Sequence, residues 1–184
     1  MYNILLILSL FDLLYLKEIN YDYMNSQINV YVEHFESDYK TYQSYLKTNT
    51  WNGEKKEVII KKVNKYLNST LKNKGDFIVS YSIKNGLDPY LATAVILQET
   101  GCYWNCSTLV KKCNNVGGNK GKPSCNNGSY RKFDSIEEGI KFSINKLNTY
   151  YKKGLTTAKK INPYYAEDKT WYKKVNNYIK KLRG

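Results

Sequence analysis

The sequence predicts a mainly α-helical protein. Apolar residues recur at three- and four-residue spacing along most of the 184 residues, which is the period of an amphipathic helix. Residues that favour helix starts and helix ends flank several of these stretches. No stretch shows the sustained alternation of apolar and polar residues that is typical of strands. With 42% apolar and 24% charged residues, the composition is that of a folded globular protein.

The first sixteen residues form an apolar segment. The run from Ile4 to Leu16 is mostly apolar and is interrupted by Asp12. It is shorter than the ~20 residues of a membrane-spanning helix, and it has the length of the apolar part of an export signal. No Lys or Arg precedes it, and no cleavage site of small residues follows it. We interpret it as a degraded export signal or membrane anchor, or as a buried helix.

Residues 17–56 predict a helical stalk and a linker. Large apolar residues alternate at steps of three and four, and Asp38 is the one exception. This pattern fits a helix packed on the rest of the protein, or a coiled-coil stalk that holds a domain away from a membrane. The polar stretch 48–56 contains Gly53 and marks the expected boundary. The apolar positions are Tyr21, Met24, Ile28, Tyr31, Phe35, Tyr42 and Tyr45.

Residues 57–184 predict a helical domain. An apolar stripe from Val58 to Leu67 indicates its first helix. Asp76 is a suitable N-cap for the next helix, and Gly86 follows that helix's end.

A buried helix comes next. Asp88 is a good N-cap, and Pro89 suits the first helical position. The stretch 91–97 is apolar almost all round, which predicts a central helix that is enclosed by others. Gly101 ends it.

The remainder of the domain begins with a loop. Residues 101–133 lose the helical period and hold all four cysteines and five glycines, so we expect loops and a small hairpin. Ser135 and Glu138 form a capping box for the following helix. A short helix after Thr156 and a last helix through Trp171 complete the chain.

Glu99 stands at the end of the buried helix. Desolvation and the negative end of the helix dipole both raise the pKa of a carboxyl group at such a place. A Glu that stays protonated near neutral pH can donate a proton to a glycosidic oxygen. Glu99 is therefore a candidate general acid, and the alternative is a surface residue at a helix end.

Four motifs in a fixed order resemble a known family. They are Gln98 to Gly101 ("QETG"), Asn115 with Gly117 and Gly118, the run 130–138 ("YRKFDSIEE") and the run 165–168 ("YAED"). Together they resemble the lysozyme-like superfamily of bacterial cell-wall hydrolases. The similarity covers about residues 59–182. It is greatest to the glucosaminidases, which are endo-β-N-acetylglucosaminidases of peptidoglycan, and lytic transglycosylases are related.

The resemblance implies a lysozyme-like helical fold and a glycosidase that needs no cofactor or metal. Glu99 matches the catalytic acid of these enzymes, and the turn at Asn115, Gly117 and Gly118 matches the one beside their sugar cleft. Aromatic rings stack on sugars, so we expect aromatic side chains to line the cleft. These are Tyr130, Tyr164 and Tyr165, with Tyr103 and Trp104 as weaker candidates.

One departure from the usual two-carboxylate pattern concerns the loop after Glu99. No Asp or Glu occurs between Glu99 and Asp134, so the loop that normally faces the acid cannot supply a second carboxylate. Attack by the sugar's own 6-hydroxyl, as in lytic transglycosylases, or by its N-acetyl group would avoid that need. Distant candidates for a base, better interpreted as helix-start charges, are Glu137, Glu138, Glu167 and Asp168.

The four cysteines favour two disulfides. Cys102, Cys106, Cys113 and Cys125 are an even number in a small basic domain, and three pairings are open. A zinc site is the alternative, but only the first two have the close spacing that such sites use. Disulfides predict an extracytoplasmic location, either secreted or membrane-anchored and associated with the cell wall.

The charge is concentrated in the main domain. The chain carries +13 overall, and residues 51–184 hold 26 basic against 10 acidic groups. Such a domain is attracted to anionic cell-wall polymers. Only two cations are Arg and the single His is His34, which argues against specific nucleic-acid recognition and a His-ligated metal. We therefore expect a peptidoglycan glycosidase; a non-catalytic glycan-binding module and a Lys-rich nucleic-acid binder are the alternatives.

Overall fold

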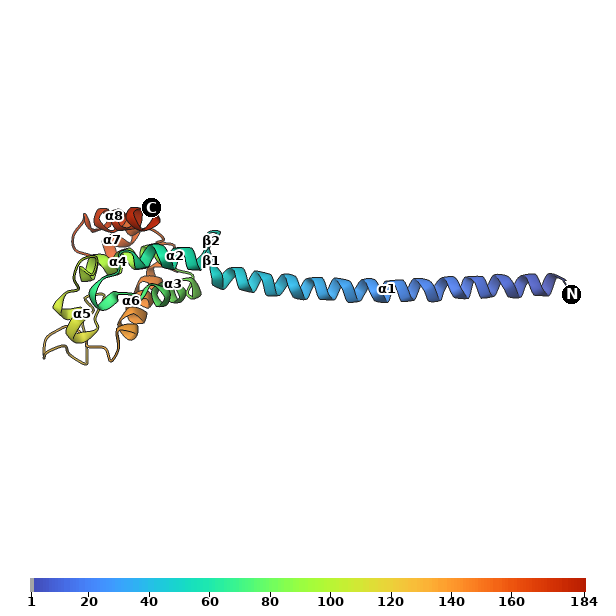
Figure 1. The fold of residues 1–184 in the computed structure, drawn as a ribbon, viewed down its shortest axis with the longest axis horizontal. Helices are drawn as coiled ribbons and strands as arrows, with labels where there is room; N and C mark the ends of the chain where they lie inside the picture. Colours follow the sequence, from blue (N-terminus) through green and yellow to red (C-terminus); the bar gives the residue numbers. More distant parts are fainter. Residues whose placement is uncertain (1) are drawn as a thin grey trace. The chain divides into compact units, whose positions relative to one another are not determined.

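The computed structural model describes the backbone of residues 2–184 and the side chains of residues 21–184. The chain divides into two compact units, Met1–Tyr45 and Leu46–Gly184, and each is described by itself. Helix α1 (Tyr2–Asn49) is one continuous helix (Figure 1). The apolar segment 1–16 lies outside the residues whose side chains are described. Within the described part of the chain, no helix is both long and apolar enough to cross a membrane.

A short hairpin occupies the stretch that we expected to be a polar linker. Strands β1 (Thr50–Trp51) and β2 (Glu54–Lys55) pair antiparallel. The turn between them places Asn52 at φ 48° and Gly53 at φ 81°, and this left-handed pair is the tight turn that an Asn-Gly sequence favours. Trp51 packs against the apolar core, so the hairpin is part of the main unit.

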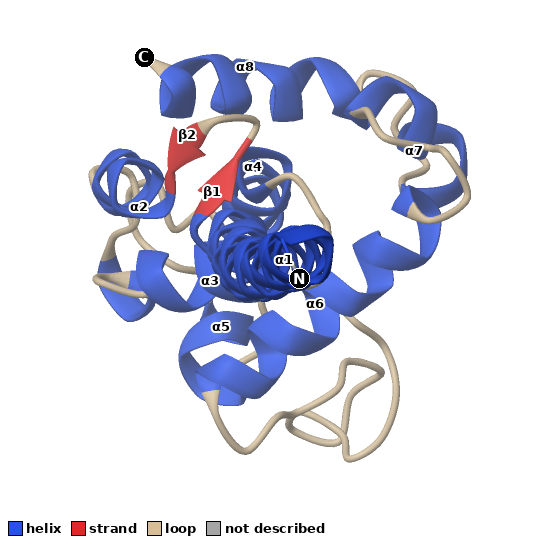
Figure 2. Ribbon diagram, turned by 90° about the vertical axis from the view of Figure 1, so that its right-hand side faces the viewer, coloured by secondary structure: helices blue, strands red, loops and turns tan. Residues whose placement is uncertain are grey.

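Helix α4 (Pro89–Thr100) lies at the centre of the domain, as predicted. It contacts α2 (Lys56–Asn64), α3 (Gly75–Lys84), α6 (Ile136–Tyr151) and α8 (Trp171–Arg183), which surround it (Figure 2). Asp88 caps it by accepting hydrogen bonds from the amides of Tyr90 and Leu91. Gly101 ends it in the left-handed conformation at φ 69°. The prediction of a mainly helical fold is confirmed.

Two local expectations differ from the structure. The N-cap of α3 is Lys74 and not Asp76, which lies in the first turn. Asn64 explains the earlier start, because its Oδ1 accepts a hydrogen bond from the Gly75 amide at 2.9 Å. The 101–133 stretch also contains an unforeseen helix, α5 (Thr108–Cys113).

The rest of that stretch is held by isolated bridges and disulfides. Two single β-bridges, at Tyr130 and Arg131, stand where we expected a hairpin. Disulfides join Cys102 to Cys106 and Cys113 to Cys125, which leaves no thiolate for the zinc alternative. The remaining elements are the 3₁₀ turn η1 (Ser69–Leu71) and helix α7 (Ala158–Tyr165).

Candidate active site

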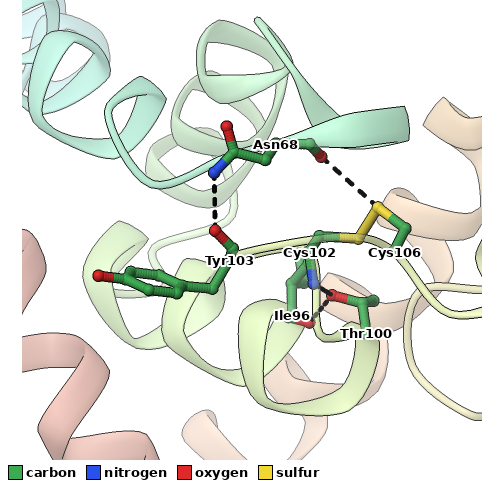
Figure 3. Close-up of a disulfide and its surroundings, with 6 residues drawn as sticks. All are labelled: Asn68, Ile96, Thr100, Cys102, Tyr103 and Cys106. Carbon is green, nitrogen blue, oxygen red and sulfur yellow. Dashed lines mark hydrogen bonds between the residues drawn. A yellow bond between two sulfur atoms is a disulfide. The ribbon is translucent and has the colours of Figure 1, made fainter.

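Glu99 lies in the last turn of α4, and the chain immediately after it is tightly held. The Thr100 hydroxyl donates to the Ile96 carbonyl at 2.6 Å and accepts from the Cys102 amide at 3.2 Å (Figure 3). The Cys102–Cys106 disulfide closes the turn that follows. This bracing holds the turn that carries the Glu99 side chain on a rigid element, as a catalytic group requires.

The Glu99 carboxyl is half-buried and has one hydrogen-bond donor. The Trp171 indole Nε1–H, from the start of α8, donates to Glu99 Oε1 at 2.9 Å. Burial raises the pKa of Glu99 above its ordinary value, and the Trp171 hydrogen bond and the Lys146 charge offset only part of that rise. The net effect is a raised pKa of Glu99, and Trp171 and Lys146 are the two groups that stabilise its ionised form.

Tyr165 forms an aromatic wall beside this carboxyl. Its ring packs on the Trp171 ring with centroids 4.9 Å apart, and the Lys146 ammonium lies 4.9 Å from the Tyr165 ring centroid. Tyr150 meets the same ring edge-on at 6.2 Å. Burial, and then the nearby charge of Glu99, raise the pKa of the Tyr165 hydroxyl. Tyr165 therefore stays a neutral phenol next to Glu99.

Two glycines let the following turn pass close to this site. A Cβ at Gly118, whose φ is 58°, would lie 3.8 Å from Glu99 Oε2. A Cβ at Gly117 would lie 2.5 Å from Ser143 Oγ, so that residue packs directly on α6. The turn at Gly117 and Gly118, which the family resemblance singled out, thus passes beside Glu99.

Asn115 lies buried within this turn. It is 1% exposed, and its Nδ2 donates to the carbonyls of Asn119 at 2.8 Å and Arg131 at 2.7 Å. Its Oδ1 accepts from the amides of Gly117 and Asn119. All four of its hydrogen-bonding positions are used by the protein. Asn115 therefore shapes the turn, and its side chain has nothing left to offer a sugar.

A family model decides what kind of domain this is. The model described as "Glucosaminidase: Mannosyl-glycoprotein endo-beta-N-acetylglucosaminidase" matches residues 75–184. The chain belongs to the glucosaminidase family. No curated protein matches it. The match begins at α3 and contains Glu99, Tyr165 and Trp171, so the site described above lies wholly within the glucosaminidase domain. Membership supports a glycosidase function directed at cell-wall glycans.

The other predicted aromatic residues of the glucosaminidase domain are more exposed. Tyr130 is 43% and Tyr164 67% exposed, and no hydrogen bond or ring contact among the described residues joins either to Glu99. The Tyr164 carbonyl accepts a hydrogen bond from the Tyr150 hydroxyl at 3.3 Å, which links it to the aromatic wall. Trp104 is 80% exposed and packs edge-on against Tyr103.

Three of the four remaining acidic candidates have other partners, and the fourth, Glu167, is exposed. Glu137 pairs with Lys74 at 2.6 Å, and Glu138 accepts from the Asp134 amide at 3.2 Å. Asp168 accepts from the Thr170 amide and hydroxyl and pairs with Lys174, and these contacts lower its pKa to about 2. Among the described carboxyl groups, Glu99 is the only one whose pKa is raised.

Two residues of this site were missed by sequence reasoning. Lys146 carries no motif, and Trp171 was noted only as the start of an aromatic helix. The Trp171–Glu99 hydrogen bond joins positions 72 residues apart. The only available signal was that a buried acid needs a donor.

Proposed function

We propose that this domain cleaves the glycan strands of peptidoglycan as a β-N-acetylglucosaminidase, with Glu99 as the general acid. The observation that carries the proposal is the half-buried Glu99 carboxyl of raised pKa, held at the end of the central helix of a glucosaminidase domain. A carboxyl that retains its proton near neutral pH is what protonation of a glycosidic oxygen needs.

The groups around Glu99 suit the charge that this step creates. When the glycosidic C–O bond breaks, its electron pair goes to the leaving oxygen, which takes the Glu99 proton. Glu99 becomes a carboxylate. The Trp171 N–H already points at Oε1, and the Lys146 charge acts at longer range. Both interactions strengthen as the carboxylate forms, so they favour the transition state over the bound substrate.

Positioning of the sugar falls to the residues beside the acid. The Tyr165 phenol is close enough to Glu99 to sense its charge, and it remains neutral and able to donate or accept a hydrogen bond. The turn at Gly118 allows backbone groups to approach a sugar that a side chain would exclude. Tyr130 and Tyr164 present exposed rings for stacking. Asn115 holds the turn itself.

The lack of a second carboxylate favours an internal nucleophile. No acidic residue occurs from 100 to 133, and of the distant candidates Glu137, Glu138 and Asp168 have other partners and Glu167 is exposed. In substrate-assisted hydrolysis the N-acetyl oxygen attacks the anomeric carbon, and water then opens the ring that results. Attack by the 6-hydroxyl would give an anhydro sugar, as in a lytic transglycosylase. The missing carboxylate also leaves a non-catalytic glycan-binding module as a second candidate.

The location that the disulfides favour and the charge of the domain agree with a cell-wall substrate. Two disulfides and a cell-wall hydrolase family favour an extracytoplasmic location. The excess of Lys over acidic residues from 51 to 184 would hold the enzyme on an anionic wall. That attraction weakens at high salt.

Mass spectrometry of digested peptidoglycan tests the proposal. The full chain, its Glu99→Gln variant and a matched control, Glu57→Gln at an exposed position of α2, are each incubated with purified sacculi. We expect reducing N-acetylglucosamine ends from the wild type and the control, and none from Glu99→Gln.

Each other result has a defined meaning. Anhydro-muramyl ends would identify a lytic transglycosylase that uses the same acid. Sacculus binding without any product would favour the binding module. Equal cleavage by Glu99→Gln would show that the acid lies elsewhere.

A further inference from the structure

A line of large apolar side chains along α1 is exposed to solvent. Over residues 21–42, ten large apolar side chains are exposed, and six of them, each 52–73% exposed, follow one three- and four-residue spacing; the other four are Tyr23, Val30, Val32 and Tyr39. An isolated helix is marginally stable in water, and helices in proteins depend on packing of their apolar face. We propose that α1 pairs with α1 of a second copy of this chain as a parallel, in-register, two-stranded coiled coil. The six side chains are those of Tyr21, Met24, Ile28, Tyr31, Phe35 and Tyr42.

The spacing of these residues identifies the kind of partner. They fall at alternating steps of three and four, which places Tyr21, Ile28, Phe35 and Tyr42 at position a of a heptad repeat. Met24 and Tyr31 then lie at position d. A helix that packs on a globular domain has a wider apolar face at a 3.6-residue period. Val32 and Tyr39 at position e widen the face of α1, but its a and d positions keep the 3.5-residue period of a coiled coil, and a second α1 has the same repeat by identity.

The charges of α1 permit self-association. In this register the flanking e and g positions between residues 25 and 41 hold no Asp, Glu, Lys or Arg. Two identical helices therefore bring no like-charged pairs together at the e and g positions, and Asp38 at position d is the one charged residue in the seam. The other acidic and basic residues lie at the outer b and f positions, as Asp22, Glu33, Glu36, Lys40 and Lys47.

Asp38 selects the parallel orientation. It is the one polar residue at a core position of the repeat. In a parallel, in-register pair the two Asp38 side chains meet in a single layer, where each also has His34 one turn earlier at 3.5 Å. In the antiparallel pair each Asp38 would instead face Ile28, which creates two layers with a carboxylate against an apolar side chain. The parallel pair confines the polar cost to one layer, in which two like charges meet and each has His34 as a neighbour; a single polar core layer, of Asn or Lys, is known to set register.

The area of the seam is sufficient for a stable dimer. Residues 21–42 span about 33 Å of helix. Six large side chains that each bury about 100 Å² per chain give roughly 1,200 Å² for the pair, at the lower bound of specific interfaces. Such a dimer would present two glucosaminidase domains to one polymer, and binding by both would increase residence on it.

Engineered cysteines test the orientation directly. All four native cysteines are in disulfides, so a new thiol reports only on its own position. In the full chain, Met24→Cys at a d position would oxidise to a covalent dimer, because facing d residues approach to disulfide distance. The matched control, Ser26→Cys at an outer f position, would remain monomeric on a non-reducing gel.

Two further measurements make the proposal falsifiable. By analytical ultracentrifugation at micromolar concentration we expect a dimer for the wild type and a monomer for Ile28→Lys with Phe35→Lys. The charge-matched control, Asn29→Lys with Ser37→Lys on the outer face, stays dimeric. A wild-type monomer, equal cross-linking of both cysteine variants, or cross-linking only when Met24→Cys chains are mixed with Tyr42→Cys chains would overturn it.

Discussion

Replacement of Trp171 by Phe isolates the one hydrogen bond that Glu99 receives. The indole Nε1–H donates to Glu99 Oε1 at 2.9 Å, and the ring packs on Tyr165. Phe keeps an aromatic ring in this buried position but has no donor. The perturbation therefore removes the interaction that lowers the pKa of Glu99 most, while burial, which raises it, remains.

The size of the effect follows from the strength of the bond. A hydrogen bond to a charged group contributes about 1.5–3 kcal/mol. Glu99 is only half-buried, so hydrogen bonds from water replace part of this contribution in the variant. We therefore take the lost stabilisation of the carboxylate as about 1.4 kcal/mol, which corresponds to one pKa unit. Because a general acid must be protonated, activity falls as pH rises through its pKa. Trp171→Phe should move the alkaline limb of the pH–rate profile upward by about one unit. Its plateau rate should fall several-fold, since the proton is held more tightly.

The assay is release of soluble glycan from sacculi between pH 4 and pH 9. Trp51→Phe is a matched control, because the buried Trp51 Nε1 has no hydrogen-bond partner among the described residues. That variant should keep the wild-type profile and lose no stability through a broken hydrogen bond. An alkaline limb that stays in place or moves to lower pH in Trp171→Phe would refute the role given to this hydrogen bond.

Three other variants test the site and its loop. Asn115→Ala leaves buried backbone groups without partners and should cost about 2–4 kcal/mol of unfolding free energy in urea, with activity lost in proportion to unfolding of the turn. Replacement of Cys113 and Cys125 by Ser opens a loop of 12 residues and should cost about 3 kcal/mol in the same assay. Glu99→Gln should melt at a higher temperature than wild type at pH 7, and the difference should shrink toward pH 4. The sign follows because a pKa raised in the folded state means that the unfolded state ionises first as pH rises, so the fold loses stability between the unfolded-state and the folded-state pKa.

The parts of the fold that sequence predicted are those with local signals. Asp88, Pro89 and Gly101 define α4 by themselves, and Ser135 caps α6 through the Glu138 amide as its motif predicts. The hairpin at residues 50–55 was missed because each strand has only two residues, too few to show alternation. Helix α5 was missed because cysteines and lysines obscure its short apolar pattern.

The site likewise contains some residues that local motifs singled out and others that no local pattern indicates. The positions of Glu99, Gly118 and Tyr165 beside one another agree with the motifs that singled them out. Trp171 and Lys146 reach Glu99 only through packing of α8 and α6 on α4, which no local pattern encodes. Asn115 stood in a motif, yet whether an Asn in a glycine turn binds a ligand or its own backbone depends on the loop's final path.

The two disulfides in the loop after Glu99 suit the raised pKa of this carboxyl group. A half-buried carboxyl of raised pKa is a source of instability at neutral pH, since its ionised form is penalised in the folded state. The loop beyond it contains few apolar residues, so it cannot be held by burial alone. The two disulfides and the four hydrogen bonds of Asn115 supply that order without further apolar residues near the carboxyl. An apolar loop would give the same rigidity but would desolvate Glu99 further, and an acid whose pKa is too high is a poor proton donor. Covalent and polar bracing therefore lets rigidity and acidity be set independently.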